Sequence, residues 1–196
     1  MTTFSKNSFV ASLLLPLLLG CSADPMDEPA DVTADWRHAG GGHASAKYAA
    51  LDQIDTTNFA DLEIAWRYKS PDLRLVQGLA YGTADYRAVP LVIDGTLYVN
   101  SNHGQVSALD PASGEELWMF DPQSYLTGSP IQTNIMIRGI EFWTDGEIQR
   151  LFIATLGKQL ISIDIDTGQL DPNFGDNGFV DLRSDLGRLE FETNFL

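Results

Sequence analysis

Apolar and polar residues alternate in short runs from about residue 60 onwards, and turn-forming residues separate these runs. A period of two residues is typical of β-strands, because successive side chains of a strand point to opposite faces of a sheet. No long stretch of this part of the sequence shows the 3.6-residue period of an amphipathic helix. The sequence therefore predicts an all-β domain.

The clearest set of predicted strands lies between residues 88 and 120. Alternation there predicts four strands, at residues 89–93, 96–101, 105–110 and 115–120. Asp94 and Gly95 form a two-residue hairpin signal, because both residue types tolerate the positive φ angles of such a turn. Turn-forming residues also occupy the other two junctions. We expect these strands to form one antiparallel sheet.

The sequence repeats itself without a gap. Residues 97–114 are similar to residues 151–168, at a constant offset of 54 positions. The identical pairs are Leu97/Leu151, Gln105/Gln159, Asp110/Asp164 and Gly114/Gly168. A repeat of about 40 to 55 residues made of short strands is typical of a β-propeller, in which each blade buries its faces by stacking on its neighbours. The predicted fold class is therefore all-β, with β-propeller blades.

The most specific motif in the repeat spans residues 108–118, with the form Ala-x-Asp-x-x-x-Gly-x-x-x-Trp. Asp110 can accept backbone N–H groups across the turn, and Gly114 can adopt a positive φ at its end. Trp118 offers a broad apolar face to an adjacent sheet. Trp66 lies 52 residues earlier and is expected to end an earlier strand. We interpret both tryptophans as structural.

The second copy of the motif is incomplete. Asp164 and Gly168 are retained, but Ser162 replaces the alanine and Pro172 stands where the tryptophan is expected. The two copies are therefore expected to share a turn but to differ in what they offer to the next blade.

The N-terminus predicts export. Lys6 precedes an apolar run at residues 9–19, which is too short to span a bilayer and is typical of a secretory signal. The sequence that ends at Cys21 resembles the lipobox of bacterial lipoproteins, in which this cysteine is lipidated. The alternative is a stray thiol in a signal peptide that is cleaved elsewhere. Ser22 in the next position resembles an outer-membrane sorting signal.

Three segments follow from these patterns. Residues 1–20 are predicted to be a lipoprotein signal peptide, residues 21–34 a flexible tether, and residues 35–196 a partial propeller. The tether is rich in Pro, Asp and Ala. The chain carries a formal net charge of −15, which argues against a nucleic-acid partner.

The motif at 108–118 resembles the tryptophan-docking motif of the quinoprotein dehydrogenases, eight-bladed propellers that carry pyrroloquinoline quinone (PQQ). Further similar stretches lie at residues 35–66, 138–143 and 174–182, so that the resemblance covers about residues 35–188. The first stretch resembles the N-terminal part of the family, where the chain supplies an outer strand that closes the ring. The resemblance implies that this chain holds that segment and about two blades.

The resemblance also implies cofactor contacts. Arg138 begins an Arg-Gly-x-x-x-Trp segment that family members place beside the cofactor, and its planar guanidinium matches a carboxylate of PQQ. Arg138 paired with a surface acid such as Asp145 or Glu147 is the alternative. Arg87 stands where alcohol-type members have a glutamate near the cofactor, so it is either a second cationic contact or a solvated strand-end residue.

The activity implied by the resemblance is the oxidation of an alcohol or an aldose sugar on the periplasmic side, with electrons passed to a quinone or cytochrome of the respiratory chain. In the family a calcium ion polarises the quinone and an aspartate acts as the base. Both are expected to come from blades beyond this chain, which we interpret as an N-terminal fragment that is inactive alone. The substrate, the acceptor and the oligomeric state stay open.

A different class of protein is also compatible with these motifs. Outer-membrane assembly lipoproteins also combine a lipobox with propellers that carry the docking motif, and they bind protein partners without a cofactor. The Arg138 segment favours the enzyme, because a scaffold has no need of an arginine directed at an empty axis. The histidines His38, His43 and His103 show no spacing typical of metal ligands.

Overall fold

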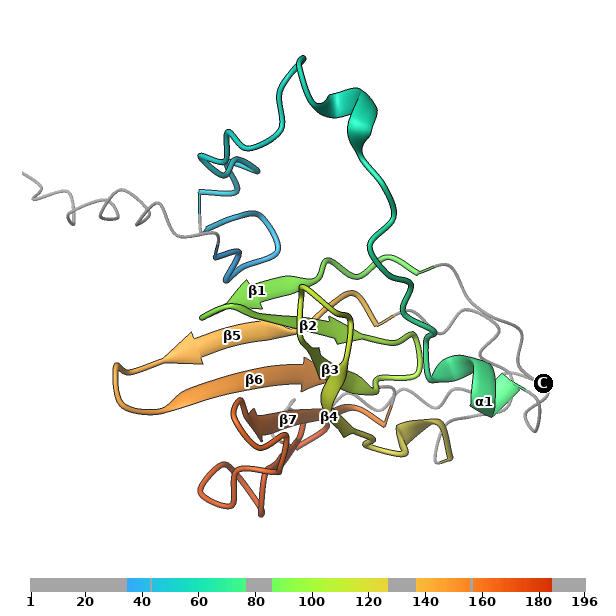
Figure 1. Cartoon of the computed structure of the whole chain (residues 1–196). Helices are drawn as coiled ribbons and strands as arrows, with labels where there is room; N and C mark the ends of the chain where they lie inside the picture. Colours follow the sequence, from blue (N-terminus) through green and yellow to red (C-terminus); the bar gives the residue numbers. More distant parts are fainter. Residues whose placement is uncertain (1–34, 43, 77–85, 127–136, 156, 185–196) are drawn as a thin grey trace, which may run out of the picture. The chain divides into compact units, whose positions relative to one another are not determined.

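Two four-stranded antiparallel sheets make up most of the secondary structure in the computed structural model (Figure 1), which describes residues 35–42, 44–76, 86–126, 137–155 and 157–184. The first sheet has the strands β1 (Leu91–Ile93), β2 (Thr96–Asn100), β3 (Val106–Leu109) and β4 (Glu116–Phe120). The second has β5 (Glu141–Thr144), β6 (Gln149–Ala154), β7 (Gln159–Asp164) and β8 (Phe179–Asp181). Each sheet follows the order of the chain, as in a propeller blade.

The first sheet confirms the predicted strand order and turns. β1 is shorter than expected, since it begins at Leu91 instead of residue 89. Asp94 and Gly95 join β1 to β2 with φ angles of 48° and 78°, as a two-residue hairpin of this type requires. In the turn between β3 and β4, Asp110 Oδ1 accepts the backbone N–H groups of Ala112 at 2.9 Å and Ser113 at 2.7 Å. The aspartate therefore holds the turn as predicted.

The second sheet repeats the register of the first. Tyr98 of β2 pairs with Ala108 of β3, and Phe152 of β6 pairs with Ser162 of β7, which are the same two positions of the repeat. The junction before the last strand differs, because Pro172 interrupts the chain and β8 begins only at Phe179. A proline cannot donate to a sheet ladder, which explains why the fourth strand is displaced along the chain.

A single apolar cluster joins the two sheets. Its fully buried members include Leu91, Val106 and Ala108 of the first sheet and Leu151, Ile153 and Ile161 of the second. In β2 the side chains of Tyr98 and Asn100 are buried, whereas in β6 Leu151 and Ile153 are buried. With the 54-residue offset, Leu151 and Ile153 correspond to positions 97 and 99, which alternate with Tyr98 and Asn100 along the strand. The buried side chains of β2 and β6 therefore lie on opposite faces of their sheets. The two copies therefore bury opposite faces because each lies against the other.

Two tryptophans each dock onto a turn that lies later in the chain. Trp118 donates its Nε1–H to the carbonyl of Ile165 at 3.1 Å, and its ring covers Gly168, where an added Cβ would lie 2.5 Å from the indole. Trp66 donates in the same way to the carbonyl of Pro111 at 2.9 Å and covers Gly114. The structural role predicted for both tryptophans is confirmed.

The expectation that Trp66 ends a strand is wrong for this structure. Residues 62–70 belong to no helix or strand, and Leu62 and Ile64 are exposed by 54% and 67%. A strand needs a neighbour for its backbone N–H and C=O groups, and none of the described residues pairs with this segment. The segment is thus held by its docked tryptophan and not by a ladder.

The segment at residues 35–38 contacts both sheets. Trp36 forms a bridge with Val92 of β1, with backbone hydrogen bonds of 2.7 and 3.0 Å. Arg37 bonds Asp94 of the first sheet at 2.7 Å and lies 5.4 Å above the ring of Phe142 in the second. His38 contacts Glu141 of β5. These contacts link the first strands of the two sheets.

Helical structure is limited to short segments among the described residues, namely η1 (Phe59–Asp61), α1 (Asp72–Val76) and η2 (Ser124–Leu126). No helix in this part of the chain has the length and apolar character needed to cross a membrane. Residues 1–34, with the predicted signal peptide, the tether and Cys21, lie outside the described residues, so their assignments stay predictions.

Candidate functional site

Arg138 lies in the segment that leads into β5, the first strand of the second sheet. Its neighbours Ile137 and Ile140 are 5% and 3% exposed, because both belong to the apolar cluster between the sheets. Arg138 itself is exposed, and the described residues offer it no hydrogen bond or ion pair. Two buried isoleucines therefore fix the backbone around a guanidinium whose donors no described residue uses.

The acidic residues considered as alternative partners of Arg138 have other roles. Asp145 Oδ1 accepts the N–H groups of Glu147 at 3.0 Å and Ile148 at 2.8 Å in the β5–β6 hairpin. These two backbone donors, that of Ile148 above all, lower the pKa of Asp145. No ion pair joins Arg138 to Asp145 or Glu147 in the described part of the chain. Neither of these two acids therefore forms the ion pair considered as the alternative for Arg138, whose role stays a prediction.

Arg87 occupies a related place in the first sheet. It is exposed, and the next residue, Ala88, is buried at 9% exposure. Arg87 precedes β1 as Arg138 precedes β5, so the two arginines stand ahead of the first strands of neighbouring sheets. Arg87 interacts with other residues of the chain, and both roles considered for it stay predictions.

A buried pair of side chains lies near the β2–β3 turn. Nδ1 of His103 is 2.9 Å from Oδ1 of Asp72, and the two side chains are only 2% and 9% exposed. Oδ2 of Asp72 accepts the backbone N–H of Asn102 at 2.9 Å. Asp72 is the first residue of α1, so this carboxylate fastens α1 to the turn between β2 and β3.

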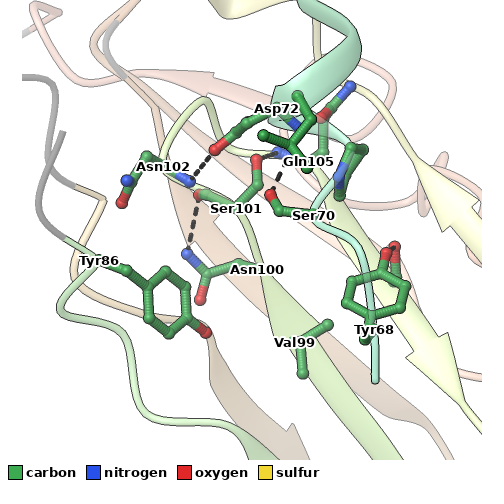
Figure 2. A pocket seen from close by; sticks show the side chains of 12 residues that line it. Tyr68, Ser70, Asp72, Tyr86, Val99, Asn100, Ser101, Asn102 and Gln105 are labelled. Carbon is green, nitrogen blue, oxygen red and sulfur yellow. Dashed lines mark hydrogen bonds between the residues drawn. The ribbon is translucent and has the colours of Figure 1, made fainter. Parts of the chain in front are cut away.

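A cavity of about 370 Å³ opens beside this pair. Figure 2 shows Tyr68 and Tyr86 on opposite sides of the β2 residues Val99 and Asn100, with Asp72 among the polar residues beyond them. The hydroxyl of Tyr68 donates to Ser107 at 2.9 Å or to Glu116 at 3.0 Å, and burial raises the pKa of this phenol. Tyr68 is therefore a neutral, oriented wall of the cavity at ordinary pH.

The described residues bring together no group of three or more His, Cys, Asp or Glu side chains that could hold a metal ion. His43 lies outside the described residues, while His38 and His103 each contact one carboxylate. The calcium ligands that the family resemblance implies were expected outside this chain, and that expectation stays a prediction.

The sequence of both sheets matches a known protein family. The family described as "PQQ: Glucose/ethanol/alcohol dehydrogenase, beta-propeller domain" matches residues 36–195, which is most of the chain. The chain belongs to this PQQ dehydrogenase family. Its two sheets are thus blades of a PQQ dehydrogenase propeller, and the docked tryptophans are the contacts between successive units of this family's fold.

Individual members of the PQQ dehydrogenase family are similar to this chain in sequence. The quinoprotein glucose dehydrogenase of Gluconobacter oxydans is 29% identical over 175 residues, which cover 82% of this chain and 21% of the relative. The quinohemoprotein alcohol dehydrogenase of Comamonas testosteroni is 31% identical over 138 residues, 70% of this chain and 18% of the relative. The chain thus spans about a fifth of the length of these relatives.

Solved structures of the PQQ dehydrogenase family give the same result. The crystal structure of the Comamonas testosteroni quinohemoprotein alcohol dehydrogenase matches with a TM-score of 0.60 and 26% identity, over 80% of this chain and 20% of that one. A quinohemoprotein alcohol dehydrogenase from Pseudomonas putida matches with a TM-score of 0.59 and 28% identity. The predicted propeller class is therefore confirmed.

The cavity and the His103–Asp72 pair were not predicted from the sequence. The two residues are 31 positions apart and belong to no motif, and Asn100 and Gln105 of the cavity lining look like ordinary strand-end residues. A buried polar cluster of this kind is visible only when the α1 segment lies against the β2–β3 turn. The retained Gln105/Gln159 pair was the only available signal, and it did not distinguish the two copies.

Proposed function

We propose that this chain forms the first part of the propeller of a PQQ-dependent dehydrogenase that oxidises an alcohol or an aldose sugar. The supporting observation is the family match over residues 36–195, within which the blade register and both tryptophan contacts are in place. The relatives include glucose and alcohol dehydrogenases, so both substrate classes remain in the proposal.

In this proposal Arg138 binds a carboxylate of PQQ, which is a planar tricarboxylate. Its exposed guanidinium can donate two parallel hydrogen bonds to one carboxylate, and Ile137 and Ile140 hold the backbone at that point. Arg87 supplies a second positive charge ahead of the neighbouring first strand. When bound, PQQ takes up the two electrons and two protons that leave the alcohol as it becomes a carbonyl compound.

The remaining parts of the machinery lie outside this chain in our proposal. The calcium ion and the base that accepts the hydroxyl proton come from later blades. The complete protein passes its electrons to a quinone or a cytochrome. We further propose that the predicted lipobox at Cys21 anchors the protein on the periplasmic side of a membrane, with Ser22 as an outer-membrane sorting signal.

The test is cofactor binding by the complete protein. Wild type and the Arg138→Ala variant would be titrated with PQQ in the presence of calcium, followed by quenching of tryptophan fluorescence. We expect Arg138→Ala to raise the dissociation constant about 10- to 100-fold, since a charge-assisted bidentate contact is worth roughly 1.5 to 3 kcal/mol. Arg138→Lys should recover only part of this loss, because an ammonium group cannot form the fork.

Arg183→Ala is the matched control, because Arg183 is exposed and paired with Asp181 at 2.7 Å in β8. It should bind PQQ like the wild type. Equal PQQ affinity in Arg138→Ala and wild type would remove the role of Arg138. A complete protein that binds no PQQ at all would instead support the scaffold, which is a non-catalytic lipoprotein propeller that binds protein partners.

A further inference from the structure

The cavity beside α1 has an unusual lining, with two buried amide side chains that each retain an unused oxygen. The cavity of about 370 Å³ lies within the size range of small-molecule sites in proteins. Tyr68, Tyr86 and Val99 provide apolar walls, and Asn100 and Gln105 provide polar groups (Figure 2). Such a combination of mostly apolar walls with a few oriented polar atoms is typical of a ligand site.

Asn100 has one amide orientation that its hydrogen bond defines. Its side chain is 3% exposed, and Nδ2 donates to the carbonyl of Ser101 at 3.2 Å. A carbonyl oxygen can only accept, so the amide nitrogen must be the atom that faces it. Oδ1 of Asn100 is consequently the atom that is buried without a hydrogen-bond partner.

Gln105 repeats this arrangement. Its side chain is 4% exposed, and Nε2 donates to Oδ2 of Asp121 at 3.0 Å. A carboxylate accepts hydrogen bonds, so this contact fixes the amide as well and leaves Oε1 without a partner. Buried polar atoms are almost always paired in proteins, with protein groups, ordered water or a ligand, so the two amide oxygens are acceptors that a molecule in this cavity can satisfy.

The charges in the lining decide the kind of donor. Oδ2 of Asp72 accepts the N–H of Asn102, and Oδ1 lies 2.9 Å from Nδ1 of His103 without a hydrogen bond of good geometry. The described residues bring together no group of three or more His, Cys, Asp or Glu side chains that could hold a metal ion, so neutral donors suit the two amide oxygens better than a metal ion does. Neutral hydroxyl groups lose less on burial and can donate to both amides, while the carbon skeleton that carries them lies against the tyrosine rings.

We propose that this cavity binds a small neutral molecule with several hydroxyl groups, such as a polyol or a monosaccharide, through donors to Asn100 Oδ1 and Gln105 Oε1. The lining residues on which this proposal rests belong to this chain, and occupancy of the cavity does not require the redox activity proposed above.

The test measures sorbitol binding to the full chain by saturation-transfer NMR and by titration. We expect wild type to bind sorbitol, and Val99→Phe to weaken binding at least tenfold, since the larger side chain of this half-buried strand residue fills the cavity. Val180→Phe is the matched control, because Val180 is a strand residue of the second sheet that is 36% exposed and does not line the cavity. Its sorbitol affinity should equal that of wild type.

A second variant distinguishes a loss of binding from a folding defect in Val99→Phe. Tyr86 is 51% exposed, so Tyr86→Leu should leave the thermal unfolding of the chain almost unchanged and still lower sorbitol affinity several-fold. Tyr48→Leu, at a tyrosine that is 73% exposed and outside the lining, should have no effect on binding.

The proposal would be overturned if sorbitol gave no saturation transfer, or if Val99→Phe and Tyr86→Leu both bound sorbitol as tightly as wild type. Preferential binding of calcium or tetramethylammonium in place of sorbitol would also overturn it. Arg138→Ala should leave sorbitol binding intact, so that a failure of the polyol site and a failure of the PQQ proposal give different results.

Discussion

Leu97 and Leu151 are the same residue at the same position of the repeat, yet only one of them is fully buried. Leu151 is 0% exposed between the two sheets, whereas Leu97 is partly exposed on the outer face of the first sheet. The difference arises because the two sheets lie against one another and so bury opposite faces. The burial of a propeller residue is therefore a property of its neighbouring blade as much as of its own sequence.

The largest expected effect tests this difference directly. Leu151→Ala should lower the free energy of unfolding by about 2–5 kcal/mol, because it leaves a cavity in the cluster shared by both sheets. Leu97→Ala should lower the free energy of unfolding by less, on the order of 1 kcal/mol. Urea denaturation of both variants measures the two values. Equal losses would mean that the two faces are buried alike, contrary to the structure.

The next effect separates the docked tryptophan from the turn beneath it. Gly168 has a φ of +69°, and a Cβ there would lie 2.5 Å from the ring of Trp118. Gly95 has a φ of +78°, but a Cβ there would meet nothing within 4 Å. Gly95→Ala should cost about 1–2 kcal/mol for the left-handed backbone alone.

Gly168→Ala should cost about 1–3 kcal/mol more than Gly95→Ala, because the indole must move as well. Thermal unfolding followed by circular dichroism gives the two losses. The docking contact would be dispensable if both variants unfolded at the same temperature.

A smaller effect compares the two docking contacts. Trp66→Phe and Trp118→Phe each remove one indole hydrogen bond to a backbone carbonyl, at 2.9 and 3.1 Å. Each should lower the free energy of unfolding by about 0.5–1.5 kcal/mol. Similar losses in chemical denaturation would show that Trp66 docks as firmly as Trp118 although residues 62–70 form no strand. A loss confined to Trp118→Phe would show that the first contact needs further blades.

The smallest effect concerns the turn before β4 and depends on pH. The N–H and hydroxyl of Ser113, with the N–H of Ala112, lower the pKa of Asp110 below its usual value of 3.8. A lowered folded-state pKa stabilises the protein above the unfolded-state pKa, and this contribution is lost as the pH falls through the folded-state pKa.

Asp110→Asn keeps an acceptor oxygen but does not titrate. Between pH 5 and pH 3 we therefore expect a smaller decline of the unfolding temperature in the variant than in wild type. Differential scanning calorimetry across this range measures both declines. Parallel curves would mean that the ionised form of Asp110 contributes nothing to the turn.

The blade structure could be predicted from the sequence because its signals are local. The alternation, the Asp94-Gly95 hairpin and the Asp110 turn each act within a few residues, and all three are present in the structure. The contact of residues 35–38 with both sheets could not be predicted, because it joins segments that are more than 50 positions apart. The strand expected before Trp66 is absent because a strand requires a partner that no described residue supplies.

The two candidate sites also differ in how far the sequence predicts them. Arg138 was found through a motif, and the structure adds that two buried isoleucines hold it and that it is exposed. The cofactor role of Arg138 and Arg87 stays a proposal. The cavity was missed because Asn100 and Gln105 acquire their significance from amide orientations that only the three-dimensional contacts define.

The docked tryptophans also imply an order of assembly during synthesis. Each indole comes before its carbonyl partner in the chain, by 45 residues for Trp66 and by 47 for Trp118. While the ribosome extends the polypeptide, each of these two rings stays without its carbonyl partner until the following turn has emerged. The order of the chain therefore places each docking side chain ahead of the turn that it covers.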